Sequence, residues 1–179
     1  TNDSVLAFSS GDVMPKTYLR QLEEGLNIVA QYLAKAIVRD GEGANCLIEV
    51  QVKGTFTNEQ ARYMARKIAS SSLVKTALHG CDPNWGRIIA AAARSGVPLE
   101  EQQISLSIGP YQVVDKGVPL TFKKEDISNY MRDRMNGSYL EDDCILINLS
   151  VGDKGSGYGV AWGCDLSREY VSINADYTT

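Results

Sequence analysis

Residues 47–68 read LIEVQVKGTFTNEQARYMARKI, and they contain the two patterns from which the fold class follows. The first part, Leu47 to Val52, alternates between apolar and polar side chains, which predicts a half-buried β-strand. In the second part Thr57 stands three residues before Gln60, a spacing typical of a capping box at the start of a helix. The stretch therefore predicts a strand followed directly by a helix. The apolar face of this helix consists of Ala61, Met64, Ala65 and Ile68.

A longer helical pattern precedes this stretch. Between Pro15 and Asp40 apolar side chains recur at spacings of three and four, which predicts a helix that buries one face. Pro15 suits the first turn and Gly41 ends the helix. Upstream, Thr1 to Ser10 predicts an apolar strand. The apolar positions of the helix are Leu19, Leu22, Leu26, Val29, Leu33 and Ile37.

Strands and helices also alternate after residue 68, in mixed order. We therefore expect an α/β or α+β sandwich of mixed sheets and helices, with one domain over residues 1–179. The predicted helices cover residues 70–78, 85–95 and 125–135. The predicted strands cover residues 104–108, a short hairpin around 113–117, and three closing strands at 144–151, 157–163 and 170–177.

The composition excludes several classes of protein. Hydrophobic residues make up 44% and the formal net charge is −4, with the basic residues scattered, so we expect no nucleic-acid partner. No apolar run approaches the roughly 20 residues of a bilayer span, so we expect no membrane partner. Four cysteines without CxxC spacing predict free thiols rather than disulfides or a metal site. One histidine, His79, cannot build a multi-histidine zinc site, and we interpret it as a structural or rim residue.

Three polar segments are candidates for a functional site, because each ends a predicted element. They are Thr1 to Asp3, Asp40 to Ala44, and Asn174 to Thr179. In the second, two glycines allow a tight turn that displays the carboxylate of Glu42, which could pair with a substrate ammonium group. The alternative is a solvated acid at the end of a helix. In the third, we expect a docked strand to fix the Asn174 amide and the Thr179 hydroxyl.

Two further segments have mainly structural interpretations. Residues 79–87, His-Gly-Cys-Asp-Pro-Asn-Trp-Gly-Arg, predict a helix N-terminus that could receive an anion, or a packed start capped by Asp82 and tied by Arg87. Residues 151–159 are rich in glycine but lack the spacing of a phosphate-binding loop, so they predict a mobile hairpin turn.

Taken together, the segments resemble the ornithine acetyltransferases, also called glutamate N-acetyltransferases, of arginine biosynthesis. The resemblance covers essentially the whole chain. It implies an N-terminal-nucleophile architecture (DmpA/ArgJ-like) and most of the β chain of the enzyme, without the N-terminal stretch of that chain. Six elements match in order: Thr-Asn-Asp-Ser-Val at 1–5, Asp-Gly-Glu-Gly-Ala at 40–44, Ser-Ser-Leu-Val-Lys-Thr-Ala at 71–77, Asp-Pro-Asn-Trp-Gly-Arg-Ile at 82–88, Ala-Trp-Gly-Cys-Asp-Leu-Ser at 161–167 and Ile-Asn-Ala-Asp-Tyr-Thr-Thr at 173–179.

The resemblance implies a reaction and roles for particular residues. Acetyl transfer from N-acetylornithine to glutamate would pass through an acetylated threonine, whose own terminal amine acts as the base. Glu42, Asn174 and Thr179 match the substrate-binding positions of the family. The nucleophile in the family is followed by apolar residues, so we expect it upstream of this stretch, with Thr1 as the alternative.

The resemblance also implies partners and a compartment. We expect an α chain cut from the same precursor, an α2β2 heterotetramer, no cofactor and a cytoplasmic location, with the plastid stroma as the alternative. Use of acetyl-CoA as a second donor stays open. Two other readings remain: an N-terminal-nucleophile amidohydrolase or aminopeptidase of the same fold, and a non-catalytic binding subunit.

Overall fold

A computed structural model of the chain describes residues 4, 6, 8, 10–12, 15–153 and 155–176, without the side chain of Thr17. Contacts divide the chain into two compact units, residues 1–33 and residues 34–179. Each unit is described by itself, and the expectation of one domain stays a prediction. No helix within the described ranges is long and apolar enough to cross a membrane.

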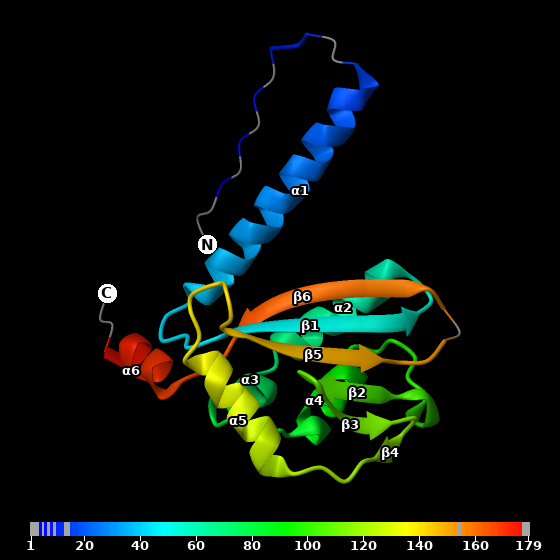
Figure 1. Ribbon diagram of the computed structural model, residues 1–179, viewed down its shortest axis with the longest axis vertical. Helices are drawn as coiled ribbons and strands as arrows, with labels where there is room; N and C mark the ends of the chain where they lie inside the picture. The colour runs from blue at the N-terminus through cyan, green and yellow to red at the C-terminus, as the bar shows by residue number, and fades with distance from the viewer. Residues whose placement is uncertain are drawn as a thin grey trace. The chain divides into compact units, whose positions relative to one another are not determined.

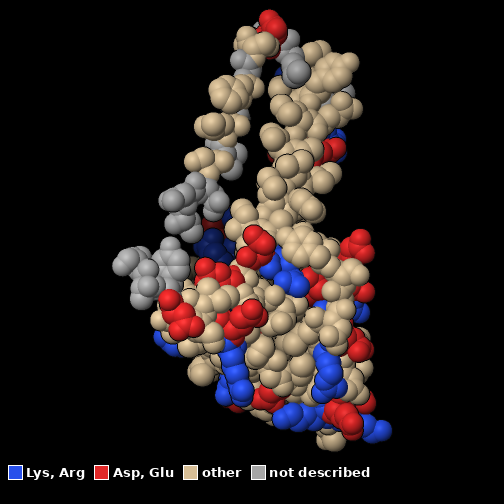
Figure 2. All heavy atoms as spheres, turned by 90° about the vertical axis from the view of Figure 1, so that its left-hand side faces the viewer, with Lys and Arg blue, Asp and Glu red and all other residues tan. Residues whose placement is uncertain are grey.

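The first unit contains most of helix α1, Lys16–Arg39, whose bounds match the sequence prediction. The prediction that this helix buries one face is wrong for this chain, because Leu22 is 51% exposed and Leu26 is 59% exposed. Figure 2 shows that few charged side chains lie on the face of this helix turned to the viewer. The strand expected at residues 1–10 lies mostly outside the described residues, and its described positions Ser4, Leu6, Phe8 and Ser10 are not in a strand.

The second unit is built on a six-stranded sheet in the order β4-β3-β2-β5-β1-β6 (Figure 1). Strands β1 and β5 are parallel, and the other neighbouring pairs are antiparallel. The α+β class predicted from the sequence is confirmed. The strands are β1 Leu47–Thr55, β2 Ser105–Ile108, β3 Tyr111–Asp115, β4 Val118–Pro119, β5 Cys144–Ser150 and β6 Gly157–Cys164.

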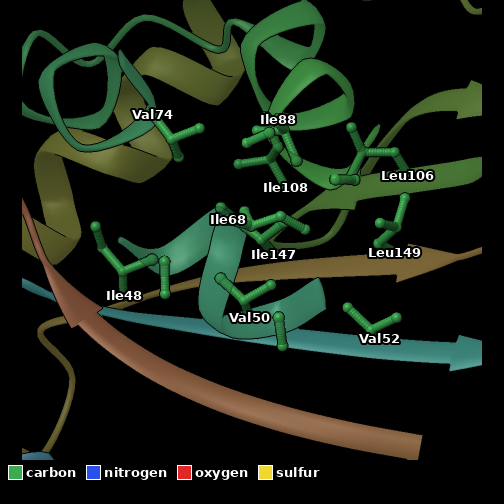
Figure 3. Close-up of a cluster of buried hydrophobic side chains, with 14 of the residues drawn as sticks. Ile48, Val50, Val52, Ile68, Val74, Ile88, Leu106, Ile108, Ile147 and Leu149 are labelled. Carbon is green, nitrogen blue, oxygen red and sulfur yellow. The ribbon is translucent and has the colours of Figure 1, made fainter. Parts of the chain in front are cut away.

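Helices pack on one face of this sheet and bury its apolar side chains. Figure 3 shows Val50 of β1 and Ile147 of β5 among side chains from helices that cover them. Ile147 and Val50 are both completely buried. The opposite face carries Glu49, Gln51 and Asn148, as the alternation of a strand requires. The helices are α2 Asn58–Ala69, α3 Ser72–His79, α4 Trp85–Ala93 and α5 Lys124–Met135, with a 3-10 turn at Glu101–Gln103.

The capping box predicted at Thr57 is present. The Gln60 backbone N–H donates to Thr57 Oγ1 at 3.2 Å, and the Thr57 backbone N–H donates to Gln60 Oε1 at 3.3 Å. Helix α2 then packs closely on β6, because glycine leaves room for its backbone. A Cβ at Gly159 would lie 2.2 Å from the backbone nitrogen of Arg62, a distance that no folded backbone tolerates. The small residues of β6 therefore set how near α2 approaches the sheet.

Two predicted elements at the C-terminal end are wrong. The strand expected at residues 170–177 is helix α6, Arg168–Asp176. Ser167 starts the helix, because its hydroxyl accepts a hydrogen bond from the Tyr170 backbone N–H at 3.2 Å. The segment at residues 151–156 is not a hairpin turn, because β5 and β6 do not pair with each other: β1 lies between them. It is a connection that crosses the end of β1.

Candidate functional site

The structure brings together two of the predicted site residues, which are 132 positions apart in the sequence. The Asn174 side chain donates from Nδ2 to Glu42 Oε2 at 2.6 Å. Glu42 lies on the turn between α1 and β1, and Asn174 lies on α6. Both side chains are exposed, as a residue that meets a ligand must be. The third predicted residue, Thr179, and the alternative nucleophile, Thr1, lie outside the described residues.

Glycine allows the turn that carries Glu42 to touch the start of α6. Gly43 has φ +66°, a backbone conformation that side chains disfavour. A Cβ at this position would lie 2.7 Å from Ser167 Oγ and 2.8 Å from the Tyr170 backbone nitrogen. Any side chain at residue 43 would therefore push the turn away from α6. Glycine here is what lets Glu42 reach Asn174.

The remaining atoms of the pair are hydrogen-bond acceptors. Both protons of the Asn174 amide are used, since Nδ2 also donates to the Tyr170 carbonyl at 2.9 Å. Within the described part of the chain, this leaves Asn174 Oδ1 and Glu42 Oε1 without a donor. A negative charge beside two acceptor oxygens favours a cationic ligand that donates hydrogen bonds, such as an ammonium group.

Asp165 holds the other end of the Glu42 turn. Its Oδ1 accepts from the backbone N–H groups of Asn45 at 2.7 Å and Cys46 at 3.1 Å. Its Oδ2 accepts from Asn45 Nδ2 at 2.9 Å and lies 2.9 Å from His79 Nδ1. An ionised carboxylate only accepts, so Nδ1 of His79 carries the proton. Burial alone would raise the pKa of Asp165, but these donors lower it below its usual value.

Comparison with known proteins identifies the family. The model of the ArgJ family matches residues 1–179. The chain belongs to the ArgJ family. The family resemblance recognised in the sequence is thereby confirmed.

Named ArgJ relatives share the whole chain but are much longer. The arginine biosynthesis bifunctional protein ArgJ of Prochlorococcus marinus strain MIT 9313 is 57% identical over 179 residues, which are all of this chain and 42% of that protein. ArgJ 1 of Nostoc sp. PCC 7120 is 49% identical and is matched over 45% of its length. The chain thus spans less than half the length of these relatives.

A solved ArgJ structure confirms the fold. The crystal structure of the arginine biosynthesis bifunctional protein argJ from Bacillus halodurans superposes with a TM-score of 0.81 and 40% sequence identity. The match covers 88% of this chain and 70% of that one. At this identity the α+β arrangement described above is that of an ArgJ protein.

Side-chain contacts connect the loop after α3 and the start of α4 to α3 and α5. The cap of α4 is Asn84, whose Oδ1 accepts from the Arg87 backbone N–H at 3.3 Å, so the expectation that Asp82 is the cap is wrong. Asp82 instead lies 2.8 Å from Lys124 Nζ, and hydrogen bonds from Lys124 and Asn84 lower its pKa. Arg87 donates to the Leu73 carbonyl at 3.0 Å and ties the loop to α3, as expected.

Sequence reasoning missed a polar cluster on the other face of the sheet. Glu49 accepts from Trp162 Nε1 at 2.8 Å and from Gln51 Nε2 at 2.6 Å. Lys35 Nζ lies 3.3 Å from the same carboxylate and above the Trp162 ring. Burial opposes ionisation of Glu49, but these partners lower its pKa below the usual value. The cluster attaches the last turns of α1 to β1 and β6. The only sequence signal for this cluster is the pair of polar residues, Glu49 and Gln51, in the alternation of β1.

The four cysteines are free, as the sequence predicts. Cys46 is buried beside Asp165, and both burial and the neighbouring charge raise its pKa. Burial similarly raises the pKa of Cys144 to about 11. Both thiols therefore stay protonated at neutral pH and are poor nucleophiles. His79 contacts Asp165 with a side chain that is 35% exposed, and its structural or rim role stays a prediction.

Proposed function

We propose that this chain is the greater part of the β subunit of an acyltransferase that moves acetyl from N-acetylornithine to glutamate. The observation that carries the proposal is the Glu42–Asn174 pair, displayed at the surface of a chain from the ArgJ family. Relatives that share the chain are named for arginine biosynthesis. The proposal assigns the pair, with Thr179, to substrate binding.

The chemistry of the pair suits N-acetylornithine. Its α-amine is acylated and neutral, so its positive charge is the ammonium at the end of its side chain. Glu42 Oε1 and Asn174 Oδ1 are both acceptors, and together they can receive that ammonium in a charge-assisted hydrogen bond. An ornithine leaving group carries the same ammonium.

The nucleophile in this proposal is a threonine at a chain terminus, outside the described residues. Its hydroxyl oxygen attacks the acetyl carbon while its own amine takes the proton, and ornithine leaves with a proton on its α-nitrogen. The acetyl-threonine ester then passes its acyl group to the neutral α-amine of glutamate, which restores the hydroxyl. Neither step needs a cofactor.

A second polypeptide completes the enzyme in this proposal. The chain spans 42% of the length of a named relative, and α1 exposes a row of large apolar side chains. Exposed apolar surface of this kind is typical of an interface. We propose that an α chain of the same precursor covers it and that two such pairs form an α2β2 tetramer in the cytoplasm.

Incubation of the natively assembled enzyme with N-acetylornithine and glutamate tests the activity. We expect ornithine and N-acetylglutamate in equal amounts. Release of acetate with no N-acetylglutamate would favour the amidohydrolase alternative, and no turnover would favour a binding subunit. Because the relatives are named bifunctional, the same assay is repeated with acetyl-CoA in place of N-acetylornithine.

Native mass spectrometry of the same preparation tests the assembly. We expect two kinds of chain in a four-chain particle. Substitution of Leu26 by Asp places a charge on the exposed face of α1 and should shift the particle to smaller masses. The matched control is Glu23→Asp, which leaves the charge of the helix unchanged. A particle unaffected by Leu26→Asp would contradict the proposed interface.

A further inference from the structure

Two buried aspartates hold the turn that carries Glu42, one from each strand beside β1. Asp143 comes directly before β5, and Asp165 comes directly after β6. The side chains of both are 0% exposed. Because β1 follows the turn and pairs with both strands, the two carboxylates lie on either side of the same turn.

Asp143 contacts the end of α1 and the segment before β5, and it reaches the turn only through Arg39. It accepts from Arg39 Nε and from the Leu140 backbone N–H at 3.1 Å. Arg39 in turn donates from Nη1 to the Ala44 carbonyl at 2.8 Å. Asp143 thus fixes the end of α1 and one carbonyl of the turn, and none of these contacts involves α6.

Asp165 connects both halves of the candidate site. Through Asn45 it fixes the turn, because Asn45 Nδ2 bridges from Asp165 to the Gly43 carbonyl at 3.2 Å. Two residues further along its own chain, Ser167 begins α6, which carries Asn174. Asp165 is therefore linked to Gly43, the residue next to Glu42, and to the start of the helix that carries Asn174. The contacts of Asp143 reach only the end of α1, Leu140 and, through Arg39, the Ala44 carbonyl.

We propose that Asp165 is a positioning residue that sets the separation between the Glu42 carboxylate and the Asn174 amide. It acts through Asn45 and Ser167 and touches no substrate. The inference rests on the proposed function of that pair. Four donors converge on its two oxygens, so only an ionised carboxylate satisfies all of them. Asparagine at this position has nearly the same shape, but its NH2 group would face donors.

A double-mutant cycle in the assembled enzyme tests the inference. Asp165→Asn and Asp143→Asn are each made alone and together with Glu42→Gln, and kcat and KM for N-acetylornithine are measured. Misplacement of a binding group by a fraction of an ångström to 1 Å costs up to about 100-fold. We expect Asp165→Asn to raise KM about tenfold or more, with a smaller change in kcat.

The cycle separates positioning from general structural support. When Glu42 is already Gln, Asp165→Asn should raise KM less than about twofold, because the group that it positions has lost its charge. The factor by which Asp143→Asn changes KM should be the same whether residue 42 is Glu or Gln. Equal behaviour of the two aspartates in the cycle would overturn the inference.

A second readout does not depend on activity. The side-chain amide of Asn174 is followed by NMR in the same variants, since its two protons are bonded to Glu42 and Tyr170. We expect Asp165→Asn to move this signal to the position of a solvated amide, and Asp143→Asn to leave it near the parent position. An unchanged Asn174 signal in Asp165→Asn would overturn the inference.

Two single variants, Asn45→Ala and Glu42→Gln, cover the cases in which Asp165→Asn does not fold or the substrate site is wrong. If Asp165→Asn does not fold, Asn45→Ala removes only one of the four donors and should shift KM and the Asn174 signal in the same direction. An unchanged KM and signal in Asn45→Ala would overturn the inference. If Glu42→Gln alone leaves KM unchanged, the proposed substrate site fails, while the NMR result still decides whether Asp165 positions Asn174.

Discussion

Helix α1 and the helices of the sheet unit contain the same kinds of apolar residue, but they use them differently. Ile68 of α2 is fully buried against the sheet, whereas Ile28 of α1 is 71% exposed. The sheet unit has its own core, closed by side chains from four helices. Among the described residues of the first unit, the large apolar side chains of α1 are exposed. Periodicity in a sequence therefore predicts where a helix forms but not what covers its apolar face.

The largest effect expected from this comparison is at the centre of the core. Ile147→Ala removes a fully buried side chain of β5 and should lower the free energy of unfolding by about 3 kcal/mol, since such substitutions cost roughly 2–5 kcal/mol. Urea unfolding of the chain measures this. A loss below about 1 kcal/mol would mean that the core is looser than the structure shows.

A smaller effect is expected at the start of α2. Thr57→Ala removes the side-chain half of the capping box and should cost about 1 kcal/mol. Thr57→Ser is the matched control, because it keeps the hydroxyl, and it should cost much less. If serine and alanine lower the urea midpoint equally, the cap does not stabilise the helix.

Asp165 should make the stability of the sheet unit depend on pH in the acid range. The folded-state pKa of Asp165 is lowered, so its stabilising contribution is present above the pKa of the unfolded chain, about 4. It is lost as the pH falls through the lower folded-state pKa. The free energy of unfolding of the parent should therefore fall more steeply below pH 4 than that of Asp165→Asn. Parallel acid profiles would contradict this assignment.

The smallest effect is expected on α1. Leu26→Ala should change the free energy of unfolding of the isolated chain by no more than about 0.5 kcal/mol, as exposed substitutions usually do. The same urea titration as for Ile147→Ala provides the measurement. A loss as large as that of Ile147→Ala would show that α1 is packed within this chain, and the comparison would fail.

Local patterns predicted most of the fold. Alternation found β1, β2, β5 and β6, and the capping box found the start of α2, because each pattern is a property of a few neighbouring residues. The helix α6 was missed because Val171 and Ile173 alternate with polar residues, as in a strand. The hydroxyl of Ser167 caps the start of this helix, and a single contact of this kind leaves no periodic pattern in the sequence.

The candidate site was predicted in part. The polar segments and the family resemblance predict Glu42 and Asn174 as site residues, and the structure brings them to hydrogen-bond distance. Their support was not predicted, because Asp165 and Asn45 are 120 residues apart and meet only when β6 pairs with β1. Contacts of this kind follow from the order of strands in the sheet. No local pattern in a single sequence contains that order.

The most direct test of substrate binding by Glu42 is the KM for N-acetylornithine after Glu42→Gln in the assembled enzyme. A hydrogen bond to a charged group contributes roughly 1.5–3 kcal/mol, so KM should rise on the order of tenfold to a hundredfold. Glu125→Gln removes another exposed carboxylate, on α5, and should leave KM unchanged. If the two variants have the same KM as the parent, Glu42 does not bind the substrate.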